Sequence, residues 1–351
     1  MKIKKVDGEL CLVWNELILP FIVKEGDIKI AQMIKLFESD DTTYSRLCRK
    51  KVENKWMYLA QVMCKGVPVK KEKHILSDGI IGLDIGPSTV AIVSDKSIQL
   101  REIFSDLKLS KAYLELRNKE KRLERKSDRQ RRQNNPENYN EDGTVKKEVR
   151  RWKRSKRQLI IERKRDDLRR RIAETRKISM RILAWELRAE GNEVRLDKDS
   201  YKGWQKQYGK SIGKHAPGML VATIKEIFER TGGKVVSLNT FVTKSSQTCT
   251  MCLKVEKKGL TEGKDSRSIR IHECSCGFLM QRDIVSAMNN KFFDEKKQLV
   301  DTVKAKAFYE EKKPLLQACI EQVIQQARER QFLPSTFGTF PELERVACND
   351  E

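Results

Sequence analysis

The first 75 residues alternate apolar and polar side chains in short runs, and this alternation predicts strands. The run WMYLAQVM at residues 56–63 has the two-residue period of a β-strand. With residues 44–51 before it and a turn at residues 53–54, it predicts a β-hairpin. Residues 27–37 predict a short helix. We therefore expect residues 1–75 to form a β-rich domain.

Two short apolar runs, at residues 80–83 and 90–93, flank an acid and a Gly-Pro turn. Such runs predict buried strands joined in a hairpin, and residues 97–103 add a third strand. Asp84 ends the first run. A carboxylate is costly to bury unless it is paired or binds metal. Asp84 is therefore either a metal ligand or an ordinary strand-end acid that faces solvent or accepts backbone hydrogen bonds.

Residues 107–189 are helical and basic, with a loop at residues 134–143. Residues 101–180 hold 28 Lys and Arg against 14 Asp and Glu. Near-whole-turn spacing predicts one packed face on the second helix, made by Ile161, Leu168, Ile172, Ile182 and Leu183. The hairpin is either a solvated coiled-coil-like element or a surface that follows a nucleic-acid backbone. The basic run at residues 150–157 favours the second interpretation, because few acids offset it.

The pattern returns to α/β after residue 190. A run at residues 193–196 predicts a strand that ends in Asp197. A helix at residues 217–229, closed by two glycines, and a strand at residues 234–242 follow.

Residues 196–218 are polar, basic and aromatic, and they predict a loop. Tyr201, Trp204 and Tyr208 are interleaved with lysines, which suits base stacking combined with phosphate contacts. The alternative is a structured loop that buries Trp204.

The net charge of +23 makes a polyanion the leading partner, since such an excess repels itself in isolation. A basic membrane-surface protein would need an apolar anchor. The apolar stretch at residues 11–23 is too short and too interrupted to span a bilayer, and it does not resemble a signal peptide. We expect a soluble cytosolic protein.

Four of the nine cysteines, Cys249, Cys252, Cys274 and Cys276, follow the pattern C-x2-C, 21 residues, C-x-C. Two paired-thiolate knuckles at this separation predict a tetrahedral zinc site in a small ribbon. The odd total argues against a disulfide framework and for a reducing compartment. Because C-x-C replaces the usual C-x-x-C, His272 is an alternative ligand.

Three acids are singled out by context: Asp84 and Asp197 at strand ends, and Asp283 at the start of a predicted helix. Mg²⁺ prefers carboxylate and water oxygens, and two ions can stabilise the attacking and leaving oxygens of a phosphodiester. The acids can meet only if their strands are neighbours, as in an RNase H-like sheet. Beyond them, residues 314–331 predict a further helix, and the tail is expected to be irregular.

The chain resembles the RuvC-nuclease half of TnpB-like transposon-encoded RNA-guided nucleases and their descendants, the compact type V CRISPR effectors. The matching stretches are GLDIGPSTVAIVSD, LDKDSYKGWQKQYGKSIGKHAPGM, GGKVVSLNTFVTKSSQTCTMC and CSCGFLMQRDIVSAMNN. They cover residues 79–95 and 191–290 in the family's order. Residues 1–75 resemble, more loosely, the end of the family's guide-RNA-binding wedge domain.

The resemblance implies an RNA-guided DNA endonuclease, or its nuclease subunit, with a RuvC-like fold. Asp84, Asp197 and Asp283 would be its catalytic acids and would bind two Mg²⁺ ions, or Mn²⁺, while the cysteines hold structural Zn²⁺. The family's second acid is usually Glu, and Asp199 is the alternative to Asp197. The alternative function is RNA-guided DNA binding with weak or no cleavage, as in a repressor. A zinc-ribbon accessory protein without a guide is a third, weaker hypothesis.

Guide RNA and target DNA are the expected partners, with either a separate recognition-lobe protein or a second copy of the chain. Family members usually carry more wedge strands and a recognition lobe ahead of the first acid. We therefore expect a minimal form, a fragment or one part of a split effector, encoded by a prokaryote, phage or mobile element. The expected nucleic-acid contacts are Arg46, Arg49, Arg150, Arg151, Lys153, Arg154, Lys202, Trp204, Lys206, Lys210 and Arg282.

The expected domain organisation follows from these stretches. It comprises a wedge-like domain at 1–75, a RuvC-like core at 76–243 that includes the helical hairpin 107–189, a zinc ribbon at 244–280, the last core motif at 281–311, and a C-terminal helix and tail at 312–351.

Overall fold

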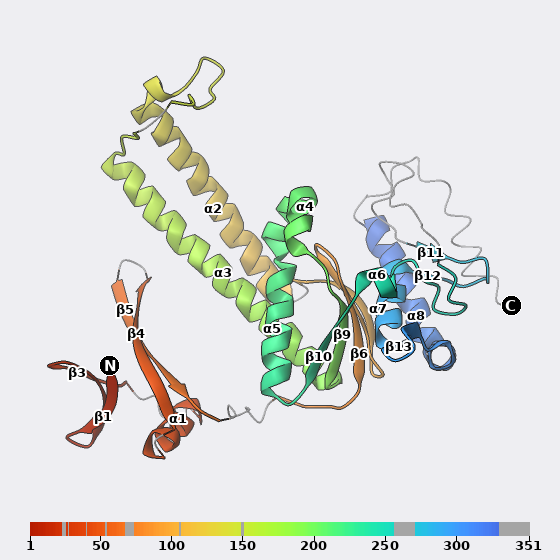
Figure 1. Ribbon diagram of the computed structural model, residues 1–351. Helices are drawn as coiled ribbons and strands as arrows, with labels where there is room; N and C mark the ends of the chain where they lie inside the picture. The colour runs from red at the N-terminus through yellow and green to blue at the C-terminus, as the bar shows by residue number, and fades with distance from the viewer. Residues whose placement is uncertain are drawn as a thin grey trace. The chain divides into compact units, whose positions relative to one another are not determined.

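The computed structural model describes residues 1–22, 26, 28–39, 41–52, 55–66, 74–104, 107–148, 151–255 and 271–329. It divides into two compact units (Figure 1). The first comprises Met1–His74 with Lys111–Thr175, and the second comprises Ile75–Ser110 with Arg176–Glu351.

The N-terminal part of the first unit is β-rich, as predicted. Its antiparallel strands are β1 (Lys2–Val6), β2 (Glu9–Trp14) and β3 (Leu17–Pro20), followed by the helix α1 (Ile28–Glu38) and the hairpin of β4 (Thr42–Val52) and β5 (Lys55–Cys64). The helix and the hairpin confirm the predictions for residues 27–37 and 44–63. The turn at residues 53–54 lies outside the described residues.

The predicted helical hairpin is present as α2 (Leu107–Asn134) and α3 (Lys156–Glu190), with the short 3-10 helix η1 (Pro136–Asn138) near its tip. Glu120 is only 4% exposed and joins the two helices, since it accepts hydrogen bonds from Arg117 at 3.0 Å and from Arg169 at 2.9 Å. The predicted packed face is wrong at Ile182, which is 37% exposed, whereas Leu183 is buried. Consecutive helical residues point about 100° apart, so both cannot face the core.

The second unit is built on a five-stranded sheet in the order β10-β9-β6-β7-β8. Its strands are β6 (Ile80–Ile85), β7 (Thr89–Val93), β8 (Ile98–Glu102), β9 (Glu193–Asp197) and β10 (Lys234–Leu238). Strand β7 is antiparallel to both β6 and β8, whereas β9 is parallel to β6 and β10 is parallel to β9. This mixed sheet is the RNase H-like α/β arrangement, which confirms the predicted fold class.

The loop predicted at residues 196–218 is wrong, because the structure has the helix α4 (Tyr201–His215) there. Ser200 caps it by accepting a hydrogen bond from the Gly203 N–H, and the helix kinks at Tyr208. Three glycines, which are poor helix formers, made the stretch look like a loop. The next helix, α5 (Pro217–Arg230), confirms the prediction.

The strand predicted at residues 234–242 ends earlier, at Leu238. The Asn239 side chain accepts a hydrogen bond from the Phe241 N–H and so starts the short helix α6 (Thr240–Thr243). Asn239 is thus the N-cap of α6, and the strand cannot continue beyond a residue at which a helix begins.

The C-terminal part contains β11 (Ile271–Glu273), β12 (Leu279–Gln281), α7 (Arg282–Lys291), β13 (Phe293–Asp294), β14 (Leu299–Val300) and α8 (Thr302–Glu329). The predicted helix start at Pro314 is wrong, since α8 runs through this proline. Asp301 opens the helix by accepting from the Lys304 N–H at 3.1 Å, and the helix continues through Pro314 although a proline there costs a backbone hydrogen bond. The predicted irregular tail, residues 332–351, lies outside the described residues, as do residues 330 and 331 at the end of the predicted helix. None of the described helices is long and apolar enough to cross a membrane.

The two faces of the sheet differ. Residues 81, 83, 90, 92, 194 and 196 share one face and are at most 3% exposed. The opposite face carries Gly82 and Asp84 and packs against α7, with Ala91 and Val93 in the same apolar cluster as Ile284 and Met288. Figure 1 shows α5 and α7 on opposite sides of the sheet.

Gly82 fixes how closely α7 approaches β6. A Cβ atom at this position would lie 1.9 Å from the Ala287 carbonyl oxygen and 2.6 Å from the Lys291 backbone nitrogen. We predict that Gly82→Ala lowers the free energy of unfolding by about 3 kcal/mol or more, because the helix has to move away from the sheet. Urea unfolding followed by circular dichroism measures this.

Gly213→Ala in α4 is the matched control, because nothing lies within 4 Å of its would-be Cβ. It is expected to be neutral or to stabilise by about 0.5–1 kcal/mol. Equal stability of the two variants would contradict the close packing of β6 on α7.

Candidate functional site

Asp84 and Asp197 lie side by side on neighbouring strands. The parallel register pairs Leu83 with Leu196, so the next residues on both strands are these two acids. Side chains two residues apart on a strand share a face, and Asp84 lies two residues after Gly82, which contacts α7. Both carboxyl groups are half-buried. The sheet therefore places two acids on its α7 side.

Asp283 is in the first turn of α7 and is 7% exposed. The last turn of this ten-residue helix is anchored at the start of β6, where Lys291 Nζ donates to the Ile80 carbonyl at 2.6 Å. At about 1.5 Å per residue, Asp283 lies roughly 12 Å along the helix axis from this anchored turn. Gln281 caps the helix and donates to Asp283 Oδ2 at 3.2 Å.

Two hydroxyl groups donate hydrogen bonds to the Asp197 carboxyl group. Its Oδ1 accepts from Ser245 Oγ at 2.9 Å and from Thr243 Oγ1 at 3.1 Å. Ser245 Oγ also lies 2.8 Å from Asn290 Oδ1, and the Asn290 amide donates to the Leu83 carbonyl at 2.9 Å. The segment that leads into the cysteines thus fixes the second acid against β6 and α7.

The electrostatics of this site reflect crowded acids. Burial raises the pKa of the Asp197 carboxyl, and the Ser245 and Thr243 hydroxyls oppose this rise. Burial, and then the charge of Asp197, raise the pKa of Asp199 to about 6. Burial, and then the charges of Asp199, Asp84 and Asp197, raise the pKa of the Tyr201 phenol. A divalent cation would relieve this crowding.

We predict that Ser245→Ala raises the pKa of Asp197 further, because it removes a hydrogen bond that stabilises the carboxylate. It should also lower the free energy of unfolding by about 1 kcal/mol. Carboxyl-carbon NMR titration measures the first effect and denaturant unfolding the second. The control is Ser237→Ala, at an exposed position on β10. An unchanged Asp197 pKa in the Ser245 variant would mean that this hydroxyl does not set the carboxylate.

The four cysteines form the cluster that the sequence predicted. Their Sγ atoms all lie within 4.8 Å of one another. The pairs Cys249–Cys276 and Cys252–Cys274 are each 3.6 Å apart, close to the roughly 3.8 Å edge of a tetrahedron with Zn–S bonds of about 2.3 Å. The cluster fits a structural zinc site.

The C-x-C knuckle is compact enough to supply both of its thiolates. Gly277, at φ +86°, closes its turn by donating from its N–H to the Cys274 carbonyl at 2.9 Å. The Cys276 backbone N–H helps to lower the pKa of the Cys274 thiol to about 7, which favours the thiolate. His272 is buried on β11 and is not part of the cluster.

The three acids do not form a comparably tight group among the residues that the structure describes. This separation is compatible with a site for two ions about 3.5–4 Å apart, over which carboxylates are spread. The donor set is hard oxygen, which fits Mg²⁺.

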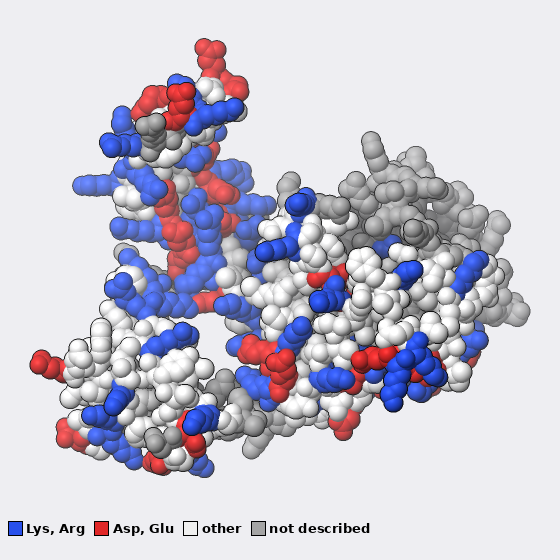
Figure 2. All heavy atoms as spheres, viewed as in Figure 1, with Lys and Arg blue, Asp and Glu red and all other residues white. Residues whose placement is uncertain are grey.

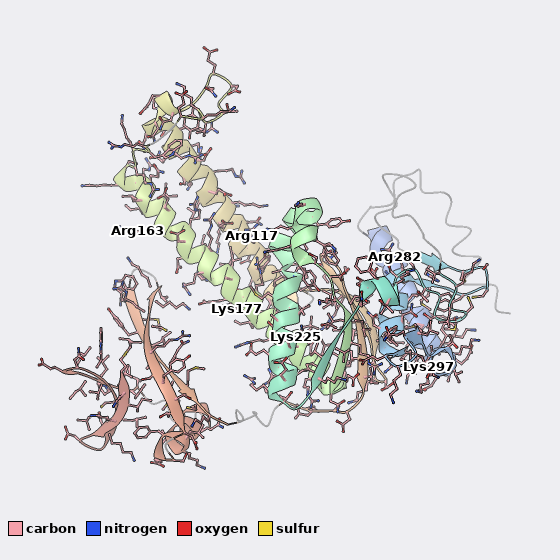
Figure 3. All side chains as sticks on the ribbon, viewed as in Figure 1. Arg117, Arg163, Lys177, Lys225, Arg282 and Lys297 are labelled. Carbon is pink, nitrogen blue, oxygen red and sulfur yellow. The ribbon has the colours of Figure 1, made fainter. Side chains whose placement is uncertain are left out.

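A basic groove of about 790 Å³ lies in the first unit. Its apolar lining comprises Leu123, Ile160 and Leu168. Its cationic lining comprises Lys51 of β4, Lys119, Arg122 and Lys126 of α2, and Arg163, Lys164 and Arg170 of α3, with Asp166 and Asp167 beside them. Figure 2 shows Lys and Arg gathered along the helical hairpin, and Figure 3 labels Arg163 on α3. The sequence predicted a basic hairpin but not these side chains.

The predicted nucleic-acid contacts fall in both units. In the first unit, Arg49, Arg151, Lys153 and Arg154 are exposed, and the last two pair with Glu137 at 3.2 Å and Glu162 at 3.8 Å. Arg46, also exposed, donates to Gln61 at 2.5 Å. Arg150 lies outside the described residues.

In the second unit, Lys202 and Lys206 are exposed on α4, and Trp204 is half-buried with its ring 5.3 Å from that of Tyr201. Lys210 is on the same helix, but its side chain is not described. Arg282 is half-buried at the first position of α7 (Figure 3).

Two groups of residues near the candidate sites were not predicted from the sequence. The first is Thr243, Ser245 and Asn290 around Asp197, and the second is the groove lining on α2 and α3. The first had a usable signal, since the hydroxyl-rich run TKSS stands directly before the first cysteine knuckle.

The sheet and the cysteine cluster define an RNase H-like α/β protein with a zinc-ribbon-type centre. Residues 218–290 match the family model described as "Cas12f1-like, TNB domain". This segment runs from α5 through the four cysteines to α7 and includes Asp283. The chain is thus similar to Cas12f1-like proteins there, which confirms the resemblance to TnpB-like nucleases and compact type V effectors.

Among solved structures, the chain is similar to Cas12f1 in the cryo-EM structure of the Cas12f1–sgRNA–target DNA complex. The two are 15% identical, with a TM-score of 0.48. The match covers 76% of this chain and 48% of that chain, so this chain spans about half the length of that protein. No curated protein sequence matches the chain.

Proposed function

We propose that this chain is an RNA-guided DNA endonuclease, or the nuclease subunit of one. The observation that carries the proposal is the placement of Asp84 and Asp197 on adjacent strands, on the face against which α7 carries Asp283. One sheet thus brings together two acids, Asp84 and Asp197, that lie more than a hundred residues apart in the sequence. The match of residues 218–290 to the Cas12f1-like TNB domain supports the guided class.

The three acids would act together on a phosphodiester bond. Bound Mg²⁺ would supply charge stabilisation for the attacking and leaving oxygens. Asp84 and Asp197 would provide oxygen ligands from the sheet, and Asp283 would provide a third from α7. Ser245 and Thr243 would keep the shorter Asp197 side chain in one orientation, since both hydroxyls donate to the same oxygen.

The basic surfaces would hold nucleic-acid backbones while base pairing with the guide reads the sequence. The groove between α2 and α3 is lined by seven Lys and Arg side chains, two Asp side chains and three apolar residues. Lys and Arg contacts of this kind bind phosphate without regard to sequence. We assign residues 1–75 to a wedge-like RNA-binding region, residues 76–243 and 281–311 to the nuclease core, and residues 244–280 to the zinc ribbon.

The experiment that tests the guided function is the sequencing of RNA that copurifies with the full chain. We expect a discrete structured RNA, protected from ribonuclease when bound. A heterogeneous sample that reflects total cellular RNA would overturn the guided function and would favour a zinc-ribbon accessory protein. A variant with Lys119, Arg122 and Lys126 changed to Glu should lose the RNA, because these three side chains line the basic groove.

A second candidate function, guided DNA binding without cleavage, is favoured by one observation. Oδ1 of Asp197 already accepts two hydroxyl hydrogen bonds, and Asp is one methylene shorter than the Glu usual in this family. Guided binding with no nicking in either Mg²⁺ or Mn²⁺ would select this candidate over the nuclease.

A further inference from the structure

The hairpin of β4 and β5 exposes two aromatic rings on one face. Trp56 is 48% exposed and Tyr58 is 59% exposed. They are two residues apart on β5 and therefore point to the same side. The register places Lys51 opposite Trp56 and Arg49 opposite Tyr58. Two rings and two cations thus alternate across one face.

The cations on this face already lie against a ring. The Arg49 guanidinium carbon is 4.1 Å from the centre of the Trp56 ring, and Lys51 Nζ is 5.4 Å from it. Cation–π attraction at these distances favours one orientation of the indole ring and limits its rotation. The face is therefore arranged before any partner binds, which lowers the entropic cost of binding.

The charge of the hairpin selects the kind of partner. Residues 42–52 and 55–64 contain five Lys and Arg and no acid. On the opposite face Arg46 donates to Gln61 and Lys50 pairs with Glu174. Arg49 and Lys51 make no ion pair with any residue that the structure describes. A partner for this face must be anionic and must offer flat apolar surfaces.

The hairpin buries little of its surface within the chain. Every residue of β4 and β5 is half-buried or exposed. A two-stranded ribbon without a covered face is marginally stable in water. A ligand that covers the aromatic face would stabilise the pairing of the two strands.

We propose that the Trp56–Tyr58 face is a stacking platform for unpaired bases of an RNA strand, with the flanking phosphates on Arg49 and Lys51. Every base has a π-face, so such stacking is tolerant of sequence, and unpaired RNA bases commonly stack on aromatic and guanidinium planes. The inference rests on the proposed nucleic-acid function and names the surface that holds single-stranded segments of the RNA. Paired RNA does not fit this platform, because its bases are already stacked on one another.

The test measures binding of the full-length chain to a fluorescein-labelled oligoadenylate RNA by anisotropy. The same sequence as single-stranded DNA and as an RNA duplex are the comparison ligands. Trp56→Ala and Tyr58→Ala should each weaken binding to the single-stranded RNA by about 10-fold, the scale of one lost base stack. Trp56→Phe, which keeps an aromatic ring and guards against misfolding, should recover most of it. Binding to the duplex should stay unchanged.

Met57→Ala and Leu59→Ala are the matched controls, because both residues are on β5, are 47% and 45% exposed, and point to the other face. They should leave RNA binding unchanged. Any one of three results would refute the platform. The first is an unchanged affinity for single-stranded RNA in Trp56→Ala, and the second is an equal loss of affinity for single-stranded and duplex RNA. The third is a variant that changes the self-association of the chain and leaves its RNA binding unchanged. Stronger effects on single-stranded DNA than on RNA would assign the platform to the DNA strand instead.

Failure of the platform and failure of the proposed nuclease are distinguishable. A chain that cleaves guided DNA with unchanged RNA affinity in Trp56→Ala refutes only the platform. A chain that loses RNA binding in that variant, but never cleaves DNA, refutes only the nuclease.

Discussion

Replacing Asp84 with Asn is expected to reduce Mg²⁺-dependent DNA cleavage by about 10³-fold or more, a loss of roughly 4 kcal/mol of transition-state stabilisation. Asp84 is central in the site, since it lies beside Asp197 on the neighbouring strand and on the face that packs against α7. Asn keeps the shape of the side chain and removes its charge, so a hard cation loses an anionic ligand. Single-turnover cleavage of guide-matched DNA measures the loss.

The same variant should also lose affinity for Mn²⁺ in calorimetry, which separates a metal ligand from a residue with a purely structural role. Asp7→Asn is the matched control, because Asp7 is exposed in the turn between β1 and β2 and its φ of +51° suits Asn. Cleavage and Mn²⁺ affinity that are both unchanged in Asp84→Asn would refute its assignment as the first catalytic acid.

Removal of zinc is expected to have the second largest effect, because the cysteines share an apolar core with α7, the helix that carries Asp283. Cys249, Cys274 and Phe278 belong to the same buried cluster as Ile284 and Val285 of α7. Structural zinc contributes of the order of 10 kcal/mol in small metal-dependent folds. A strong chelator, or Cys274→Ser, should therefore loosen residues 271–291 and reduce cleavage.

Metal analysis and hydrogen exchange measure this effect. The intact chain should hold one zinc ion, and Cys274→Ser should hold none and should lose exchange protection in α7. Cys48→Ser is the control, because Cys48 is half-buried on β4, outside the cluster. A chain that contains no zinc, or one whose α7 keeps its protection after chelation, would contradict the structural role.

Local sequence patterns predicted the sheet and the cysteine cluster because their signals are short-ranged. The runs at residues 80–83 and 90–93 are bounded by turn residues, and the strands β6 and β7 follow them closely. The two knuckles fold as the spacing of their thiols requires. The roles of the three acids stay a prediction, although the strand order places two of them side by side.

The errors have physical causes that lie beyond local pattern. Helix α4 carries Gly203, Gly209 and Gly213, and its cap at Ser200 offsets part of their low helix propensity. Ile182 obeys an approximate period, but its neighbour Leu183 takes the buried position.

The partners of Asp197 could not be predicted from the sequence because they depend on tertiary packing. Ser245 is 48 residues further along the chain. It reaches Asp197 only because α6 turns the chain back at the end of β10. The groove lining likewise depends on how α2 and α3 are rotated about their axes, which charge counts do not specify.

The most direct test of the account is guided cleavage by the chain bound to its copurified RNA. Linear DNA with a target matched to the guide is compared with the same DNA carrying a scrambled target, in Mg²⁺ and in EDTA. We expect cleavage at or beside the matched target in Mg²⁺ and none in EDTA. Intact matched DNA in both Mg²⁺ and Mn²⁺, with the guided complex shown to be bound, would contradict it.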